Sequence, residues 1–387
     1  MPRTKNIVPV NPKVLIWARE SIGLSPEDAA QALKVPVQTL SDWESGAAGV
    51  GITELRTIAA QYKRPVAALL QPMAPPLPAL PEDFRTVEGK GPSFTVETRV
   101  AIRDAQRIRD LASELIEDDP TLFPTPQLPQ ASLTDSSQES GLLERDTFGI
   151  DIDTQLHWSN VNQAFNAWRA RMQQLGIITL VKPMARGDCR GFSLYQPGAI
   201  PIIVVNGREA DQAKIFTLFH EYAHLALNRE GLCLEKDEVS VERWCNTFSA
   251  SLLVPQNRLR LMASGPVSST NDVQDLAWRF KVSRHVIALR LGEINLAFPG
   301  LYGAILAEDR ERFDWEKPEV PEDEEYGGRP QDAVRLSEVG AGFADIVLTA
   351  LERGRITPVD ASEFLDMRPD KLEALAKRVG AVKARHG

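Results

Sequence analysis

The sequence lacks the features that mark disulfide-rich, membrane-spanning or secreted proteins. Its three cysteines, Cys189, Cys233 and Cys245, are widely spaced and form no C-x-x-C pair, which argues against a disulfide framework or a structural cysteine–zinc knot. No apolar run approaches the about 18 residues of a membrane span, and the densest, residues 200–205, has the length of a strand. The N-terminal residues contain no apolar stretch typical of a secretory signal. We therefore expect a cytoplasmic protein that does not associate with membranes.

The sequence also lacks a large excess of one charge, except in a single segment. The formal net charge is −9, but residues 308–325 hold ten acidic side chains against three basic ones, so the rest of the chain carries about −2. Bulk charge thus argues neither for nor against a polyanionic partner. Hydrophobic residues make up 43% of the 387 positions, enough for two or three ordinary domains with buried cores.

Periodic patterns predict an α+β fold that is mostly α. Residues 11–70 carry five short helical patterns, which need one another's apolar faces and therefore predict a compact helical module. Residues 71–81 are rich in proline, and residues 119–146 are rich in Pro, Ser, Thr and Gln, so both are expected to be linkers. A longer helix is expected at 98–117 between them. A helix at 156–175, a small sheet and further helices follow, the strand-like runs being 177–181, 191–196 and 200–205.

The sharpest chemical motif is H-E-x-x-H at residues 220–224. On a helix, His220 and His224 share one face, so both imidazoles can reach one metal ion. Glu221 is turned off that face and can hold a water molecule as a general base. The arrangement is that of zinc peptidases, and the alternative is a buried helix whose histidines are merely hydrogen-bonded.

A catalytic zinc site normally has a third protein ligand, and the sequence offers several carboxylates for it. Glu242 opens a helical pattern 18 residues after His224, and Glu238 lies one helical turn earlier. Glu235 and Asp237 are also near. Each of these acids is equally explained as part of a solvated helix start, where the macrodipole favours negative charge. Spacing alone favours Glu242 over Glu238 and leaves both open.

Three stretches carry a resemblance to a known family. The run IIVVN at 202–206, the run FTLFHEYAHLALN at 216–228 and the run ERWCNTFSASLLVP at 242–255 resemble the ImmA/IrrE family of bacterial zinc metallopeptidases. That family pairs a strand before the active helix with a later helix of the pattern E-x-x-[AC]-N, whose glutamate is the third zinc ligand. The resemblance implies that this ligand is Glu242, with Asn246 as a landmark of the pattern.

The resemblance also implies an activity and a class of substrate. His220, His224 and Glu242 would hold Zn²⁺, and Glu221 would act as the catalytic base of an endopeptidase. The protein substrate would be a repressor or antitoxin-like regulator, whose cleavage switches a stress, mobile-element or defence response. The strand at 202–205, if it lies at a sheet edge, is expected to pair with the extended substrate.

Residues 24–46 resemble the helix-turn-helix of the Xre (Cro/cI) family. The side chains expected to meet base edges in DNA are Gln38, Thr39 and Ser41. Asp42 and Glu44 are expected where phosphates would approach, and residues 1–70 hold only two more basic than acidic side chains. DNA binding is therefore predicted from the motif rather than from charge. The alternative is a protein-docking module or one that forms a homodimer.

A second pattern of this kind spans residues 272–294, where ImmA/IrrE-like proteins often carry a helix-turn-helix. Four cations give it a basic character: Arg279, Lys281, Arg284 and Arg290. Contact with DNA is one interpretation. A structural lid packed against the peptidase is at least as well supported.

Together these motifs predict five regions along the chain. They are an Xre-type helix-turn-helix (1–71), a proline-rich linker with a connecting helix (72–146), a zinc metallopeptidase core (147–264), a second helix-turn-helix-like unit (265–298), and an acidic linker with a helical C-terminal region (299–387). The leading hypothesis is a zinc endopeptidase joined to a DNA-binding module. The rival is a transcriptional regulator or toxin–antitoxin component whose peptidase fold does not cut.

Overall fold

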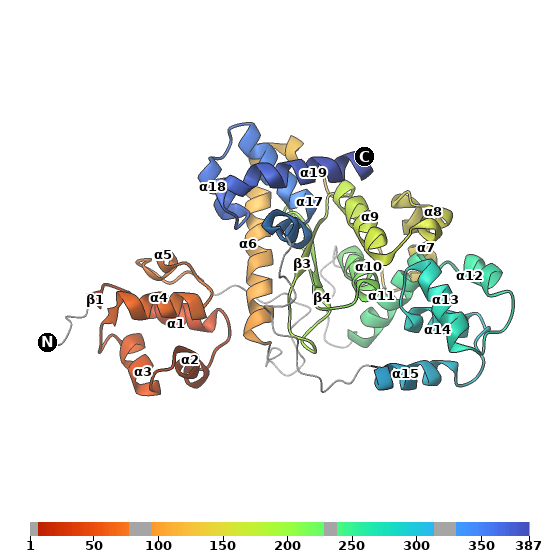
Figure 1. Ribbon diagram of the computed structural model, residues 1–387, viewed down its shortest axis with the longest axis horizontal. Coiled ribbons are helices and arrows are strands. Elements are labelled where there is room, and N and C mark those ends of the chain that lie inside the picture. The colour runs from red at the N-terminus through yellow and green to blue at the C-terminus, as the bar shows by residue number, and fades with distance from the viewer. Residues whose placement is uncertain (1–6, 77–93, 228–237, 313–329, 387) are drawn as a thin grey trace. The chain divides into compact units, whose positions relative to one another are not determined.

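The computed structural model describes residues 7–76, 94–227, 238–312 and 330–386. Its contacts divide the chain into two units, Met1–Asp104 with Pro183–Asp188, and Ala105–Lys182 with Cys189–Gly387 (Figure 1). Most described residues are helical and the sheets are small, so the predicted fold class is confirmed. Cys233, Glu235, Asp237, residues 77–81 of the proline-rich segment and most of the acidic segment lie outside the described residues.

The first unit contains the five predicted helices. They are α1 (Pro12–Glu20), α2 (Pro26–Leu33), α3 (Val37–Ser45), α4 (Ile52–Gln61) and α5 (Val66–Leu69). Two very short strands, β1 (Ile7–Val8) and β2 (Val50–Gly51), pair antiparallel and were not predicted. The helices enclose one hydrophobic core that includes Leu15, Leu33, Leu40 and Leu55.

Local signals explain the turn between α2 and α3. Ser25 caps α2 by accepting a hydrogen bond from the Asp28 backbone N–H at 3.0 Å, and Pro26 occupies the first helical position. Lys34 ends α2 in a left-handed conformation with φ 56°. The polypeptide can then turn sharply into α3, which takes the place of the second helix in the predicted helix-turn-helix.

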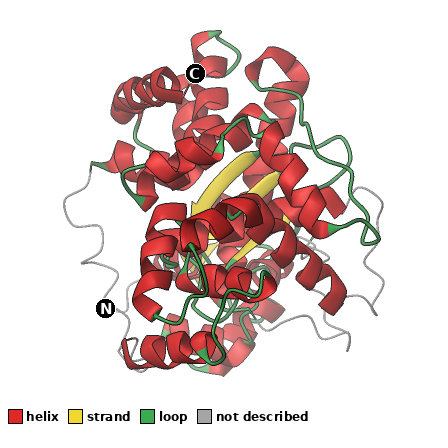
Figure 2. Cartoon of the chain, turned by 90° about the vertical axis from the view of Figure 1, so that its right-hand side faces the viewer, coloured by secondary structure: helices red, strands yellow, loops and turns green. Residues whose placement is uncertain are grey.

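The second unit surrounds a three-stranded sheet with helices (Figure 2). Helix α6 (Val96–Asp118) runs into it from the first unit. The strands are β3 (Ile178–Lys182), β4 (Gly191–Leu194) and β5 (Ile202–Asn206). The other elements are η2 (Pro120–Leu122), α7 (Ser137–Thr147), α8 (Ile152–His157), α9 (Val161–Gln174), α10 (Asp211–Leu227), α11 (Glu238–Leu253), α12 (Gln256–Ala263), α13 (Thr270–Phe280), α14 (Arg284–Glu293), α15 (Leu301–Arg312), α17 (Gln331–Glu352), α18 (Pro358–Phe364), η4 (Pro369–Lys371) and α19 (Leu372–His386).

Strand β5 is the centre of the sheet. It pairs parallel with β3, with Ile202 opposite Ile178, and antiparallel with β4, with Ile202 opposite Leu194. Every residue of β5 is buried. Residues 202–205 were expected to pair with substrate only if they lay at a sheet edge, and this condition is not met. An apolar run of β-branched residues is also what a central strand requires.

Helix α10 packs on β4 and β5 and also contacts α9. Trp168 of α9 meets Phe219 of α10 edge to face, with ring centroids 4.9 Å apart. Phe148 packs in the same way against both rings. These aromatic contacts fix the buried face of α10 and thereby set the direction of its opposite face.

Helix α17 packs on β3 and is broken at Gly340, whose φ is 74°. A Cβ at this position would lie 2.7 Å from the Thr179 carbonyl oxygen, so only glycine fits. The buried Arg169 of α9 donates to the Thr179 carbonyl at 2.8 Å and to the Ser337 carbonyl at 3.0 Å. One guanidinium thus joins α9, β3 and α17.

Two expectations for the second unit are wrong in detail. The helix expected at 156–175 is divided into α8 and α9, because Trp158 is extended and Asn160 caps a new helix by accepting from the Gln163 backbone N–H. The linker expected at 119–146 contains most of α7.

Among the described helices, none combines the length and the apolar character that crossing a bilayer requires.

Candidate metal centre

Helix α10 presents two imidazoles side by side. His220 and His224 are four residues apart on one face, and their Nε2 atoms are 3.1 Å apart. The opposite face of the helix is buried against the aromatic core and the sheet. The pair therefore projects from a rigid element, as a metal-binding H-E-x-x-H helix requires.

Helix α11 brings a carboxylate to the same point. Glu242 Oε2 lies 3.2 Å from His220 Nε2, and Glu242 Oε1 lies 3.2 Å from His224 Nε2. Among the described residues, these three form the group of side chains that could hold a metal ion. Ligand atoms at 2.0–2.1 Å from a tetrahedral zinc ion would be about 3.3 Å apart, so the observed spacing fits such an ion.

The carboxylate at the centre suits a cation. Hydrogen bonds with His220 and His224 hold the pKa of the Glu242 carboxyl well below its usual range. Burial disfavours the charged form of His224, but its hydrogen bonds with Cys245 and Glu242 outweigh this effect and raise its pKa, so a metal ion that binds His224 would displace a proton. The Glu242 side chain is 49% exposed while that of His224 is 9% exposed, so solvent reaches the centre from the carboxylate side.

Two consecutive residues of α11 orient the imidazoles. Asn246 Oδ1 lies 3.1 Å from His220 Nδ1, and since an amide oxygen only accepts, Nδ1 carries the proton and Nε2 is left with its lone pair toward the cluster. Cys245 is hydrogen-bonded with His224. From the sequence, Asn246 was only a landmark of the family pattern. The signal for its role is its spacing of four residues from Glu242, which puts both on one face of α11.

Removing the Asn246 acceptor is expected to weaken metal binding about tenfold, because partners that orient a ligand histidine typically contribute at least that much. We would measure zinc affinity of Asn246→Ala by competition with a chelating dye. Asn246→Asp keeps an acceptor and should bind like wild type. Arg243→Ala, at an exposed neighbouring position, is the matched control. Equal affinity of Asn246→Ala and wild type would contradict the orienting role.

Glu221 is not one of the three clustered residues. It is buried, 7% exposed, and lies beside the first residue of β4. A Cβ on Gly191 would be 2.4 Å from Thr217 Cγ2 and 3.5 Å from Glu221 Cγ, so this glycine allows β4 to lie directly against α10. Glu221 thus stays off the face that the two histidines share.

A helix with H-E-x-x-H and a carboxylate from the following helix defines a site of the metallopeptidase class. Residues 172–292 match the M78 peptidase family, described as IrrE N-terminal-like domain, and residues 15–69 match a helix-turn-helix family. The chain thus contains an IrrE N-terminal-like domain, which implies a metallopeptidase, and an N-terminal helix-turn-helix of the Xre type. Both predicted resemblances are confirmed. No curated protein matches the sequence.

In the helix-turn-helix, α3 carries the three residues predicted to read bases. Gln38 and Ser41 are exposed and Thr39 is half-buried. Gln38 Nε2 donates to Asp42 Oδ1 at 2.8 Å within the same helix. Two polar side chains of the predicted set are therefore accessible on α3.

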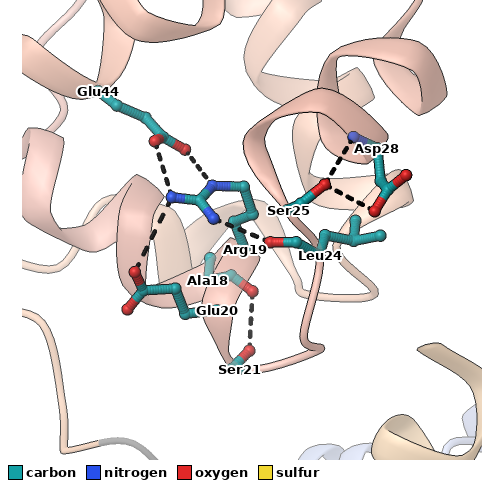
Figure 3. A network of polar contacts seen from close by, with 8 residues as sticks. All are labelled: Ala18, Arg19, Glu20, Ser21, Leu24, Ser25, Asp28 and Glu44. Carbon is teal, nitrogen blue, oxygen red and sulfur yellow. Dashed lines mark hydrogen bonds and ion pairs between the residues drawn. The ribbon is translucent and has the colours of Figure 1, made fainter. Parts of the chain in front are cut away.

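Glu44 does not reach the surface where phosphates would approach. The buried Arg19 donates to its two carboxylate oxygens at 2.7 and 3.0 Å, and to the Leu24 carbonyl oxygen at 2.8 Å (Figure 3). The Glu44 side chain is only 11% exposed. The expectation that Glu44 opposes DNA is wrong, because its charge is neutralised inside the module by Arg19.

The second helix-turn-helix-like unit uses most of its cations internally. Arg284 pairs with Glu308 and Asp309 of α15, and Arg290 is 1% exposed with its guanidinium on the Val254 carbonyl oxygen. Lys281 donates to two carbonyls at the end of α13. Helices α13 and α14 share the hydrophobic core that holds α10 and α11. These contacts favour the structural lid over a DNA-binding surface.

Proposed function

We propose that this protein is a zinc-dependent endopeptidase. The observation that carries the proposal is the cluster of His220, His224 and Glu242, whose ligand atoms are 3.1–3.2 Å apart, with Glu221 next to it. The donor set of two imidazoles and one carboxylate suits zinc and leaves one position of a tetrahedron for water. The M78 family match agrees with a metallopeptidase.

Different residues of the site have different roles in the proposed reaction. When bound, zinc would polarise the scissile carbonyl and lower the pKa of water. Glu221 takes the proton of the attacking water and then delivers it to the leaving amine. One carboxyl group can do both because it first accepts a proton and then donates it. Its buried position, 7% exposed, keeps that carboxyl out of bulk solvent. Asn246 keeps His220 in the tautomer that can bind metal.

The proposed substrate is a repressor or antitoxin-like protein that controls a stress, mobile-element or defence response. Support comes from the combination of domains, since a peptidase joined to an Xre-type helix-turn-helix belongs among regulators rather than digestive enzymes. The helix-turn-helix would bring the peptidase to DNA where such a regulator acts.

The test is cleavage of candidate regulators encoded by adjacent genes. We expect the full-length protein to cut one of them, a chelator to stop the reaction, and about one equivalent of zinc per chain to restore it. A protein that binds zinc but cuts none of these regulators would instead fit a non-cutting transcriptional regulator or toxin–antitoxin component.

We also propose that α3 binds DNA, because Gln38 and Ser41 are exposed on the recognition helix and Glu44 is neutralised by Arg19. Gln38→Ala should weaken binding to a specific site about tenfold, the usual cost of losing a base contact. Binding should fall with added salt. Fluorescence anisotropy with DNA from the adjacent promoter measures both effects.

Gln31→Ala, at an exposed position of α2, is the control for the DNA experiment. A pseudo-palindromic site would further indicate that two copies bind as a homodimer. Identical binding by Gln38→Ala and wild type would remove α3 from the interface and favour a protein-docking or dimerising role for this module.

A further inference from the structure

Helix α7 lies outside the family match at 172–292, yet it packs closely on α11 (Figure 1). Its inner face is formed by Gly141, Glu144 and Arg145, while Leu142 and Leu143 are 41% and 70% exposed. Phe148, at the C-cap of α7, anchors that end of the helix in the aromatic core. The rest of the helix buries polar residues and a glycine and leaves its leucines outside, so specific contacts must hold it.

The first contact is a close approach of two backbones. A Cβ on Gly141 would lie 2.4 Å from the Phe248 carbonyl oxygen and 3.2 Å from Ser251 Cβ. Real side-chain atoms do not come this near a carbonyl oxygen, so α7 can lie at this distance from α11 only through glycine.

The second contact fixes the C-terminal end of α11. The buried Arg145 donates from Nη1 to the Leu252 carbonyl oxygen at 2.7 Å and to Gln155 Oε1 at 2.8 Å. The last carbonyls of a helix have no partner within it, and a cation there also complements the helix dipole. Arg145 therefore restrains α11, and Glu242 with it, along the helix axis.

The third contact reaches the other ligand helix. Tyr222, between the two histidines on α10, donates its hydroxyl to Glu144 Oε2 at 2.7 Å. Both groups are largely buried, and burial raises the pKa of Glu144. The short hydrogen bond thus connects α7 to the turn of α10 that carries His220 and His224.

We propose that α7 is a brace that sets the position of the Glu242 carboxylate relative to the two imidazoles. Gly141 and Arg145 hold α11, and the Glu144–Tyr222 hydrogen bond holds α10, so one helix restrains both sources of metal ligands. These four are positioning residues. The inference rests on the proposed metal site, and it extends the functional core to residues before the family match.

The test compares metal binding by full-length variants. Tyr222→Phe removes the hydroxyl that connects α7 to α10, and we expect zinc affinity to fall about tenfold, as for other partners outside the ligand set. The visible spectrum of the cobalt-substituted protein should change as well, because it reports ligand geometry. Glu144→Gln keeps an oxygen acceptor for Tyr222 and should behave like wild type. Leu143→Ala, exposed on the same helix, is the matched control.

Gly141→Ala provides a second, independent variant, since its methyl group would force α7 away from α11. We expect the same loss of affinity and the same spectral change. Variants that melt at lower temperature but keep wild-type zinc affinity and cobalt spectrum would overturn the brace, since α7 would then only stabilise the fold. A wild-type protein that binds neither ion would overturn the metal site, and the brace with it.

Discussion

Glu221→Gln should abolish proteolysis while metal content and fold stay as in wild type. Glutamine keeps the size of the side chain and can hydrogen-bond, but it cannot accept the proton of water. Loss of a general base typically costs about 10²–10⁴ in rate, enough to make a slow regulatory cleavage undetectable. Because Glu221 is not among the three clustered residues, zinc bound per chain and the melting temperature should not change.

The comparison with His220→Ala makes this experiment decisive. That variant loses a residue of the metal cluster, so both hypotheses expect a phenotype in cells. Only the peptidase hypothesis expects Glu221→Gln to show the same phenotype. A Glu221→Gln strain that behaves like wild type, beside a defective His220→Ala strain, would make us abandon the proteolytic function.

Glu242→Ala should lose most of the bound metal, while Glu238→Ala should retain it. The Glu242 oxygens are 3.2 Å from both histidine nitrogens, whereas Glu238 is one turn away, about 6 Å along the helix axis. Changes to residues that merely orient ligands cost about 10–100-fold in affinity, so loss of a ligand should cost more than about 100-fold. Metal analysis after dialysis, and zinc titration, measure the difference.

Glu238 begins α11, but its side chain lies outside the described residues, so the paired variants are needed to decide between the two acids. Glu242→Gln is the informative intermediate, because it keeps an oxygen donor without the charge and should bind metal more weakly than wild type. If Glu238→Ala empties the site and Glu242→Ala does not, our choice of third ligand is wrong.

The sequence predicts the two ligand helices well because both have clear periodicity and flanking signals. The H-E-x-x-H motif lies on α10 and Glu242 lies on α11, so both are helical as predicted. The spacing of His220 and His224 on a helix then determines their distance. Bringing Glu242 to them requires a chain reversal whose geometry no local pattern contains. Spacing favoured Glu242 but left Glu238 open, and the family resemblance decided between them.

Helix α7 shows where such prediction fails. Leu142 and Leu143 of this helix are exposed, while Gly141 and Arg145 are buried and Glu144 is half-buried. This reverses the usual pattern, so a search for an apolar stripe predicts a polar linker. The second helix-turn-helix-like unit fails in a related way, since Arg284 and Arg290 suggested a basic surface but bond within the fold. Tertiary partners decide both cases, and a single sequence does not reveal them.

The Arg169 guanidinium joins α9, β3 and α17, and this limits how the protein can be divided or recombined. A fragment cut to the matched residues 172–292 would lack Arg169 and Gly340, and β3 would lose the helix that covers it. If recombination replaced the C-terminal helices alone, the new helices would need a glycine at the position of Gly340 and a carbonyl at the position of Ser337. The helices after residue 330 therefore have to stay with the domain that carries the metal cluster if β3 is to keep its cover and Arg169 its partners.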